Sequence, residues 1–347
     1  MEKENNIINN NSSISNISDY NNNNSIFSQA KNDINDKSNL EKEALILTKK
    51  ADNKLNPGCC LDTLCISKTK RYSDACKLYK KAGDKYKICR QWRKAGECYE
   101  HCSKIKTNLK GDQLTFYQES FFCYSKVNND NNSKKIFEKM NQYLERKGEY
   151  YQAGKNNENL AIKKENDEKY DEAINYYLQA FKYYETDGKH ESLKNNMEIK
   201  ITELMMVHNH PDGPKKVPAM LENIGNNYLK NPLTNYSASD YFGKSVLSII
   251  YYSNNPSEGR KYIKKYKDID PIFEESTIYN LCCDVINYME KKDINNLKNA
   301  IKEYKEICEV DDYMIDILNK LVKKTENNNN ISENKENDFN IEEEDLK

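Results

Sequence analysis

One residue spacing constrains the fold of this chain more than any other feature, and it occurs twice. Alanines and tyrosines alternate at steps of four, three and four residues, and these steps return to the same side of an α-helix with about 3.6 residues per turn. A neighbouring helix can approach closely at each alanine and pack against each tyrosine, so the spacing predicts stacked helical hairpins. The two stripes are Ala75, Tyr79, Ala82 and Tyr86, and Ala173, Tyr177, Ala180 and Tyr184.

The composition fits thin helical layers better than a thick globular core. Among 347 residues, 37% are apolar and 31% are charged, and Tyr occurs 26 times against one Trp. No apolar run is long enough to span a bilayer, and the Asn- and Ser-rich start lacks the apolar segment of a signal peptide. We therefore expect a cytoplasmic protein whose eleven cysteines are reduced thiols.

The charges are segregated, although the net charge is only -1. Residues 68–110 contain fourteen Lys or Arg against four Asp or Glu, whereas the last six residues are mainly acidic. A basic region and an acidic end indicate two different partners. The alternative is that both runs are simply solvated faces.

Helical patterns and breaks divide the chain into four parts, and no segment alternates as a strand would. We expect a disordered Asn-rich tail over 1–37, a tetratricopeptide-like solenoid of helical hairpins over 38–232, a helical bundle over 233–325, and a flexible tether with an acidic terminus over 326–347. The fold class is all-α. The helices expected in the solenoid after residue 68 are Tyr72–Tyr86, Arg90–Cys102, Gln113–Val127, Lys134–Arg146, Glu149–Lys164, Tyr170–Tyr184 and Glu191–Val207.

Nothing in the sequence points to catalysis, a cofactor or a metal. Glycine-rich phosphate loops are absent. Cys98, His101 and Cys102 lie within one helical turn, but no second ligand pair sits at a suitable spacing for zinc. We expect these cysteines to serve as small packing residues. The chain is therefore predicted not to be an enzyme.

An apolar loop over residues 57–66 connects two polar helices. Exposing each large apolar side chain there forfeits about 1.5–3 kcal/mol relative to burial. The loop either folds back on its own helices or dips into a membrane interface beside the basic region, and its thiols are candidate acylation sites. The residues concerned are Cys59, Cys60, Leu61, Leu64, Cys65 and Ile66.

Five pieces in the right order resemble the α/β-type soluble NSF-attachment proteins, the adaptors of SNARE disassembly. The resemblance covers the chain from about residue 40. The matching pieces are Trp92 with Ala95-Gly96, Tyr170-Asp171-Glu172-Ala173-Ile174 with Tyr183-Tyr184, Asn235-Tyr236-Ser237-Ala238-Ser239-Asp240-Tyr241-Phe242, Ile301-Lys302-Glu303-Tyr304, and the ending Glu343-Glu344-Asp345-Leu346-Lys347.

The resemblance implies an adaptor that hydrolyses nothing itself. It implies a basic surface for syntaxin-type SNARE complexes, with several copies per bundle, and it places Arg90, Lys155 and Lys194 there. The loop over 57–66 would attach the protein peripherally to membranes. The hexameric ATPase NSF would be recruited and stimulated through the acidic end and one bundle residue, namely Glu290, Glu343, Glu344, Asp345 and Leu346.

The chain departs from the family pattern in its loop and its bundle. The loop lacks the usual paired Phe, and Asn287 and Lys291 stand where acids would extend the patch around Glu290. A generic tetratricopeptide-type scaffold would explain the stripes equally well, but neither the acidic terminus nor the apolar loop. A nucleic-acid binder would use the basic region, yet the acidic tail argues against it.

Overall fold

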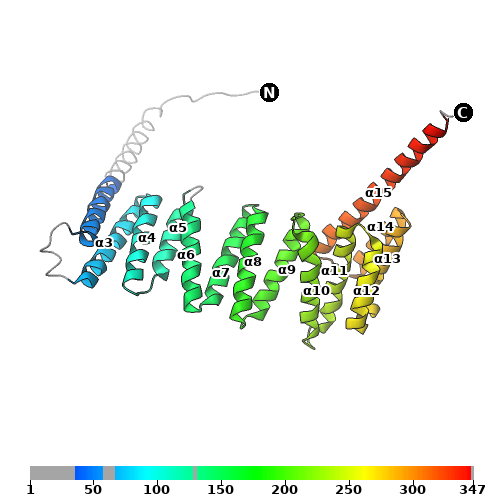
Figure 1. Cartoon of the computed structure of the whole chain (residues 1–347), viewed down its shortest axis with the longest axis horizontal. Helices are drawn as coiled ribbons and strands as arrows, with labels where there is room; N and C mark the ends of the chain where they lie inside the picture. The colour runs from blue at the N-terminus through cyan, green and yellow to red at the C-terminus, as the bar shows by residue number, and fades with distance from the viewer. Residues whose placement is uncertain (1–35, 58–66, 128–130, 345–347) are drawn as a thin grey trace, which may run out of the picture. The chain divides into compact units, whose positions relative to one another are not determined.

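The computed structural model describes the backbone of residues 36–57, 67–127 and 131–344, with side chains as far as residue 328 (Figure 1). Every regular element in these ranges is a helix, so the predicted all-α fold is confirmed. After a helix over residues 36–55, the elements are α3 (Lys68–Ile88), α4 (Trp92–Asn108), α5 (Leu114–Ser125), α6 (Asn131–Lys147), α7 (Tyr150–Asn166), α8 (Tyr170–Asp187), α9 (Glu191–Val207), α10 (Gly213–Leu229), η1 (Asn235–Ser237), α11 (Ala238–Ser253), α12 (Pro256–Ile269), η2 (Pro271–Glu275), α13 (Thr277–Glu290), α14 (Ile294–Ile307) and α15 (Asp312–Glu344).

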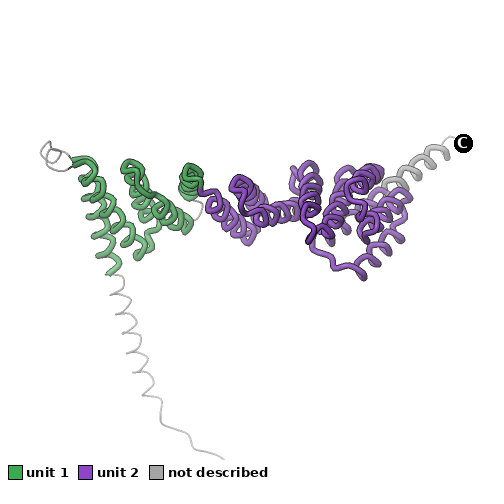
Figure 2. The backbone as a smooth tube through the Cα atoms, turned by 90° about the horizontal axis from the view of Figure 1, so that it is seen from below, with its two compact units in different colours: residues 1–148 green, residues 149–347 purple. Residues whose placement is uncertain are grey.

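The chain divides into two compact units, residues 1–148 and residues 149–347 (Figure 2). The predicted boundaries at residues 232 and 325 fall inside the second unit and stay predictions. Of the predicted disordered tail over residues 1–37, residues 1–35 lie outside the described residues, and residues 36 and 37 begin the first described helix.

In unit 1, helices α3 to α6 pack in sequence order, each against the next. The first predicted stripe lies in its core: Ala75, Tyr79, Ala82 and Tyr86 are at most 3% exposed. The hydroxyl of Tyr79 donates a hydrogen bond to Asp52 on the preceding helix. The alternation therefore does what its spacing predicts, because alanine admits a neighbouring helix and tyrosine fills the space beside it.

In unit 2, α7 to α10 also pack in sequence order, and the second stripe is buried. Tyr184 on α8 lies against Gly154 on α7, where an added Cβ would come within 2.7 Å of the tyrosine ring. Its hydroxyl donates to Glu158 one turn further along α7, at 2.6 Å. Tyr177 donates in the same way to Glu165, at 2.8 Å.

In the second half of unit 2, helices also contact helices that are distant in the sequence. Helix α11 contacts α12, α13 and α15, and α15 also packs against α9 and α14. Two lysines fix α15 there. Lys320 donates to the carbonyls of Met206 and Val207 at the end of α9, at 2.5 and 3.2 Å, and Lys324 donates to the carbonyl of Tyr251 on α11.

Several predicted helix limits differ from the structure by a few residues: α3 begins at Lys68 rather than at Tyr72, and α4 ends at Asn108 rather than at Cys102. Helix α4 begins at Trp92 rather than at Arg90, because Arg90 has a left-handed backbone with φ of 59° and forms the turn after α3. In α15 the backbone is helical as far as Glu344, and the flexible tether expected over residues 326–347 stays a prediction. Residues 312–344 contain neither Gly nor Pro, so nothing in them interrupts the helical hydrogen bonds.

Within the described ranges, none of the helices combines the length and apolar composition that crossing a bilayer requires.

Candidate interaction surfaces

Arg90 lies in the turn between α3 and α4 of unit 1, with its side chain exposed. The turn is closed by backbone hydrogen bonds from Arg90 to the carbonyl of Lys87 and from Gln91 to that of Tyr86, at 3.0 and 2.9 Å. The left-handed conformation is uncommon for a residue with a Cβ. It places a cation at the tip of a hairpin, where a partner can reach it.

Lys155 and Lys194 lie in unit 2, on α7 and α9, and each is paired with an acid. Lys155 is 3.1 Å from Glu158, and its side chain remains 44% exposed. Lys194 is 3.7 Å from Glu191 and only 18% exposed. Among the described residues, no hydrogen bond or ion pair joins the two lysines. Lys155 therefore remains accessible to a partner, whereas Lys194 is largely covered.

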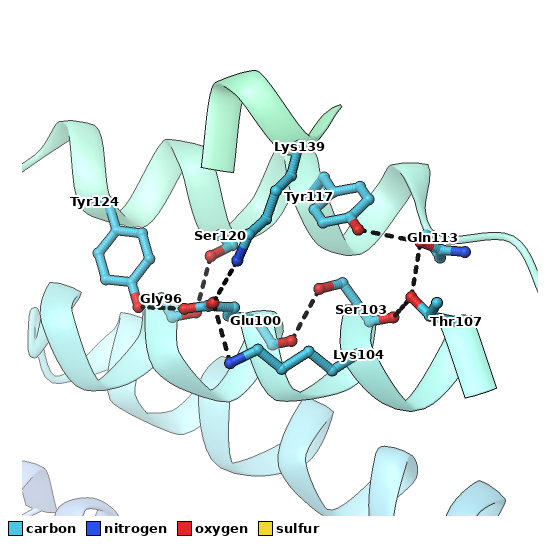
Figure 3. Close-up of polar contacts among 10 residues, drawn as sticks. All are labelled: Gly96, Glu100, Ser103, Lys104, Thr107, Gln113, Tyr117, Ser120, Tyr124 and Lys139. Atoms are coloured by element: carbon cyan, nitrogen blue, oxygen red, sulfur yellow. Dashed lines mark hydrogen bonds and ion pairs between the residues drawn. The ribbon is translucent and has the colours of Figure 1, made fainter. Parts of the chain in front are cut away.

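Besides the group formed by Lys155, Glu158 and Tyr184, a polar cluster that was not predicted from the sequence lies on α4, α5 and α6 (Figure 3). Glu100 on α4 accepts from Lys139 at 3.0 Å and from the hydroxyl of Tyr124 at 3.3 Å, and Lys104 is 3.1 Å away. These lysines hold the pKa of Glu100 below its usual range, although burial acts in the opposite direction. In this cluster and in the one around Glu158, a glutamate on one helix accepts a hydrogen bond from a tyrosine of the next helix and also pairs with a lysine.

The sequence signal that could have predicted this arrangement is a Gly followed four residues later by a Glu. Gly96 precedes Glu100 in α4 as Gly154 precedes Glu158 in α7. In each case a tyrosine ring lies against the glycine and its hydroxyl reaches the glutamate. The spacing is short enough to see in the sequence, but the tyrosine that completes it is 24 or 26 residues away.

Glu290, the predicted acidic contact of the bundle, ends α13 and is engaged within the protein. Both of its oxygens accept from Arg260 on α12, at 3.2 and 2.5 Å, and Arg260 also donates to Asn287 at 3.0 Å. The hydrogen bond from Arg260 holds the pKa of Glu290 below its usual range. The charge of Glu290 is thus largely neutralised where the sequence predicts a negative patch.

The remaining predicted contacts fall at or beyond the limits of the description. Glu343 and Glu344 are in the last turn of α15, and only their backbone is described. Asp345 and Leu346 lie outside the described residues. So do all the predicted apolar residues of the loop, namely Cys59, Cys60, Leu61, Leu64 and Ile66.

The cysteine and histidine group in α4 does not form a site. Cys98 and Cys102 are buried in the core of unit 1, and burial raises the pKa of the Cys98 thiol to about 12. His101 instead is exposed and stacks on Tyr79, with ring centroids 4.8 Å apart. Among the side chains that the structure describes, no group of three or more His, Cys, Asp or Glu could hold a metal ion.

Fold and surfaces together define a class of protein. Stacked helical hairpins that present exposed cations and acids, as on α3–α6 and α7–α10, are the architecture of a protein-binding scaffold.

Comparison with known proteins gives the family. The family model described as "Soluble NSF attachment protein, SNAP" matches residues 42–326, and the chain belongs to this family. It is 26% identical to the vesicular-fusion protein SEC17 of Komagataella phaffii over 76% of this chain and 88% of that protein. It is 22% identical to the human alpha-soluble NSF attachment protein and 23% identical to the bovine beta-soluble NSF attachment protein. Those two matches cover 83% of this chain and 96% and 95% of the relatives.

Proposed function

We propose that this protein binds assembled SNARE bundles, recruits the ATPase NSF and stimulates it, so that the bundle is taken apart after membrane fusion. The observation that carries the proposal is the family match over residues 42–326, together with relatives named for NSF attachment and vesicular fusion. In this role the protein is an adaptor and hydrolyses nothing itself.

The basic surface would recognise the bundle. Residues 68–110 carry fourteen basic and four acidic side chains, a surplus of ten positive charges. Arg90 and Lys155 are exposed cations, whereas Lys194 is better placed to orient its neighbours than to touch a partner. Such charges raise the rate of encounter and set orientation more than they add affinity. Binding should therefore weaken as salt is added.

The ATPase would be engaged mainly by the acidic end of the chain. Arg260 already holds Glu290, so less free negative charge remains in the bundle. Glu343, Glu344 and Asp345 would supply the charge, and Leu346 would be the apolar anchor.

We further propose peripheral attachment to membranes in the cytoplasm, through the loop over residues 57–66. Its apolar side chains and the basic residues that follow would add weak insertion to electrostatic attraction. Several copies would surround each bundle of syntaxin type, and nucleic acid would not be a partner.

The experiment that tests the proposal is an ATPase assay with the full chain, NSF and an assembled SNARE bundle. We expect strong stimulation, loss of that stimulation in Leu346→Ala, and unchanged bundle binding by this variant. Lys347→Ala is the matched control, because it alters the neighbouring terminal residue and leaves the anchor intact. No stimulation by a folded wild-type protein would contradict the proposal and leave a general helical-repeat scaffold.

A further inference from the structure

In the described part of unit 1, an exposed phenylalanine ring on α5 lies beside Trp92 of α4 and Lys87 of α3. Phe122 on α5 is 43% exposed. Trp92 at the start of α4 meets it edge-on, with ring centroids 6.1 Å apart and planes at 83°. Helices α3, α4 and α5 follow one another in space (Figure 1), and we call the side chains of Phe122 and Trp92 the Phe122 patch.

Cations surround this ring. The ammonium groups of Lys87 and Lys126 each lie 5.3 Å from the centroid of Phe122. Lys87 is also paired with Glu119, at 2.6 Å. Lys126 is exposed and is not paired with any carboxylate that the structure describes. The patch is therefore an apolar centre with a positive rim.

We propose that the Phe122 patch is an apolar anchor for an acidic helical bundle, the partner assigned to the basic surface above. This inference rests on the proposed function and adds the element that charge alone does not supply. An aromatic side chain that becomes desolvated at the centre of an interface contributes more affinity than rim charges do. The surrounding cations would pair with acids of the bundle and so fix where the ring docks.

A membrane surface is the competing partner for aromatic residues among cations, and the fold argues against it. The loop proposed to meet the membrane precedes α3, which begins at Lys68, whereas the patch lies at the other end of this helix, beside Lys87. Twenty helical steps separate the two ends, a distance of about 30 Å. A patch so far along the helix from the loop is suited to a protein partner.

The test measures binding of the full chain to an assembled SNARE bundle at about 50 mM and about 500 mM salt, which screen exposed charges weakly and strongly. We expect Phe122→Ala to weaken binding about tenfold at both salt concentrations, because the lost contact is apolar. Lys126→Ala should weaken binding mainly at low salt. Ile162→Ala on α7 is the matched control, since Ile162 is 42% exposed and lies outside the patch.

Three outcomes separate the possibilities. If wild-type protein binds the bundle and Phe122→Ala binds as tightly as Ile162→Ala, the anchor is wrong and the proposed function stands. If wild-type protein does not bind the bundle at all, the proposed function fails first. If Phe122→Ala loses binding only to vesicles containing phosphatidylserine, the patch serves a membrane and the inference is overturned. Circular dichroism of each variant confirms that it is folded, and Phe122→Leu, which keeps an apolar side chain, should retain part of the affinity.

Discussion

Replacing Gly96 by alanine tests the close packing of α4 against α5. In an ordinary helix interior this change stabilises by about 1 kcal/mol, because glycine has the lower helix propensity. Here an added Cβ would lie 2.7, 2.9 and 3.0 Å from three ring atoms of Tyr124, which is only 1% exposed. Forcing a side chain out of a packed core in this way costs about 1–3 kcal/mol.

Displacing the ring of Tyr124 also weakens hydrogen bonds between α4 and α5. Tyr124 donates to Glu100, and Ser120 donates to the carbonyl of Gly96 at 2.9 Å (Figure 3). Weakening one such hydrogen bond costs about 1 kcal/mol. The helix-propensity gain offsets only part of this, so we expect Gly96→Ala to reduce the free energy of unfolding of unit 1 by about 1–3 kcal/mol.

The assay is urea unfolding followed by tryptophan fluorescence. Trp92 is the only tryptophan and lies one turn before Gly96 on α4, so its signal reports unit 1. The control is the same change in a Tyr124→Leu background. With the ring gone, Gly96→Ala should become neutral or stabilising by about 1 kcal/mol. The reasoning is refuted if Gly96→Ala stabilises the protein while Tyr124 is present.

Three further changes probe other parts of the fold. Burial, and then the hydrogen bond to Glu158, raise the pKa of Tyr184 well above its usual range, so the folded protein favours the neutral phenol. The folded state therefore has the full stabilisation below about pH 10. Above that pH it loses about 1.4 kcal/mol of unfolding free energy per pH unit for each such tyrosine. Urea unfolding at rising alkaline pH checks this, and a flat profile would contradict it. Arg260→Met should raise the pKa of Glu290 toward its ordinary value, which NMR titration measures. The salt-dependent part of binding to the ATPase should strengthen. An unchanged pKa would show that the ion pair is not formed in solution. Lys324→Met removes the donor to the carbonyl of Tyr251, so amide exchange in residues 312–326 should accelerate, whereas unchanged protection would mean that apolar packing alone holds α15.

The helical repeats could be predicted from the sequence because their signal is local. The stripe from Ala173 to Tyr184 fixes which side of α8 is buried, and the helix predicted over Glu191–Val207 has these limits in the structure. The turn at Arg90 is not predictable in this way, because an arginine in the sequence does not indicate a left-handed backbone.

The interaction surfaces were less predictable because they depend on distant pairs. Arg260 is 30 residues from Glu290, and no spacing rule joins them. The Phe122 patch likewise combines side chains of α4 and α5 with a lysine of α3, and α5 contains three Phe, so its sequence does not indicate which of them faces solvent. Burial follows local periodicity, whereas the partners of surface charges follow tertiary packing.

The most direct test of the central claim follows disassembly itself. A fluorescently labelled SNARE bundle is incubated with NSF and ATP, and its dissociation is recorded with and without the full chain. The account predicts that dissociation requires both this protein and ATP, and that it fails with Leu346→Ala but proceeds with Lys347→Ala. Dissociation at the same rate without this protein, or none in its presence, would contradict the claim that it is the adaptor.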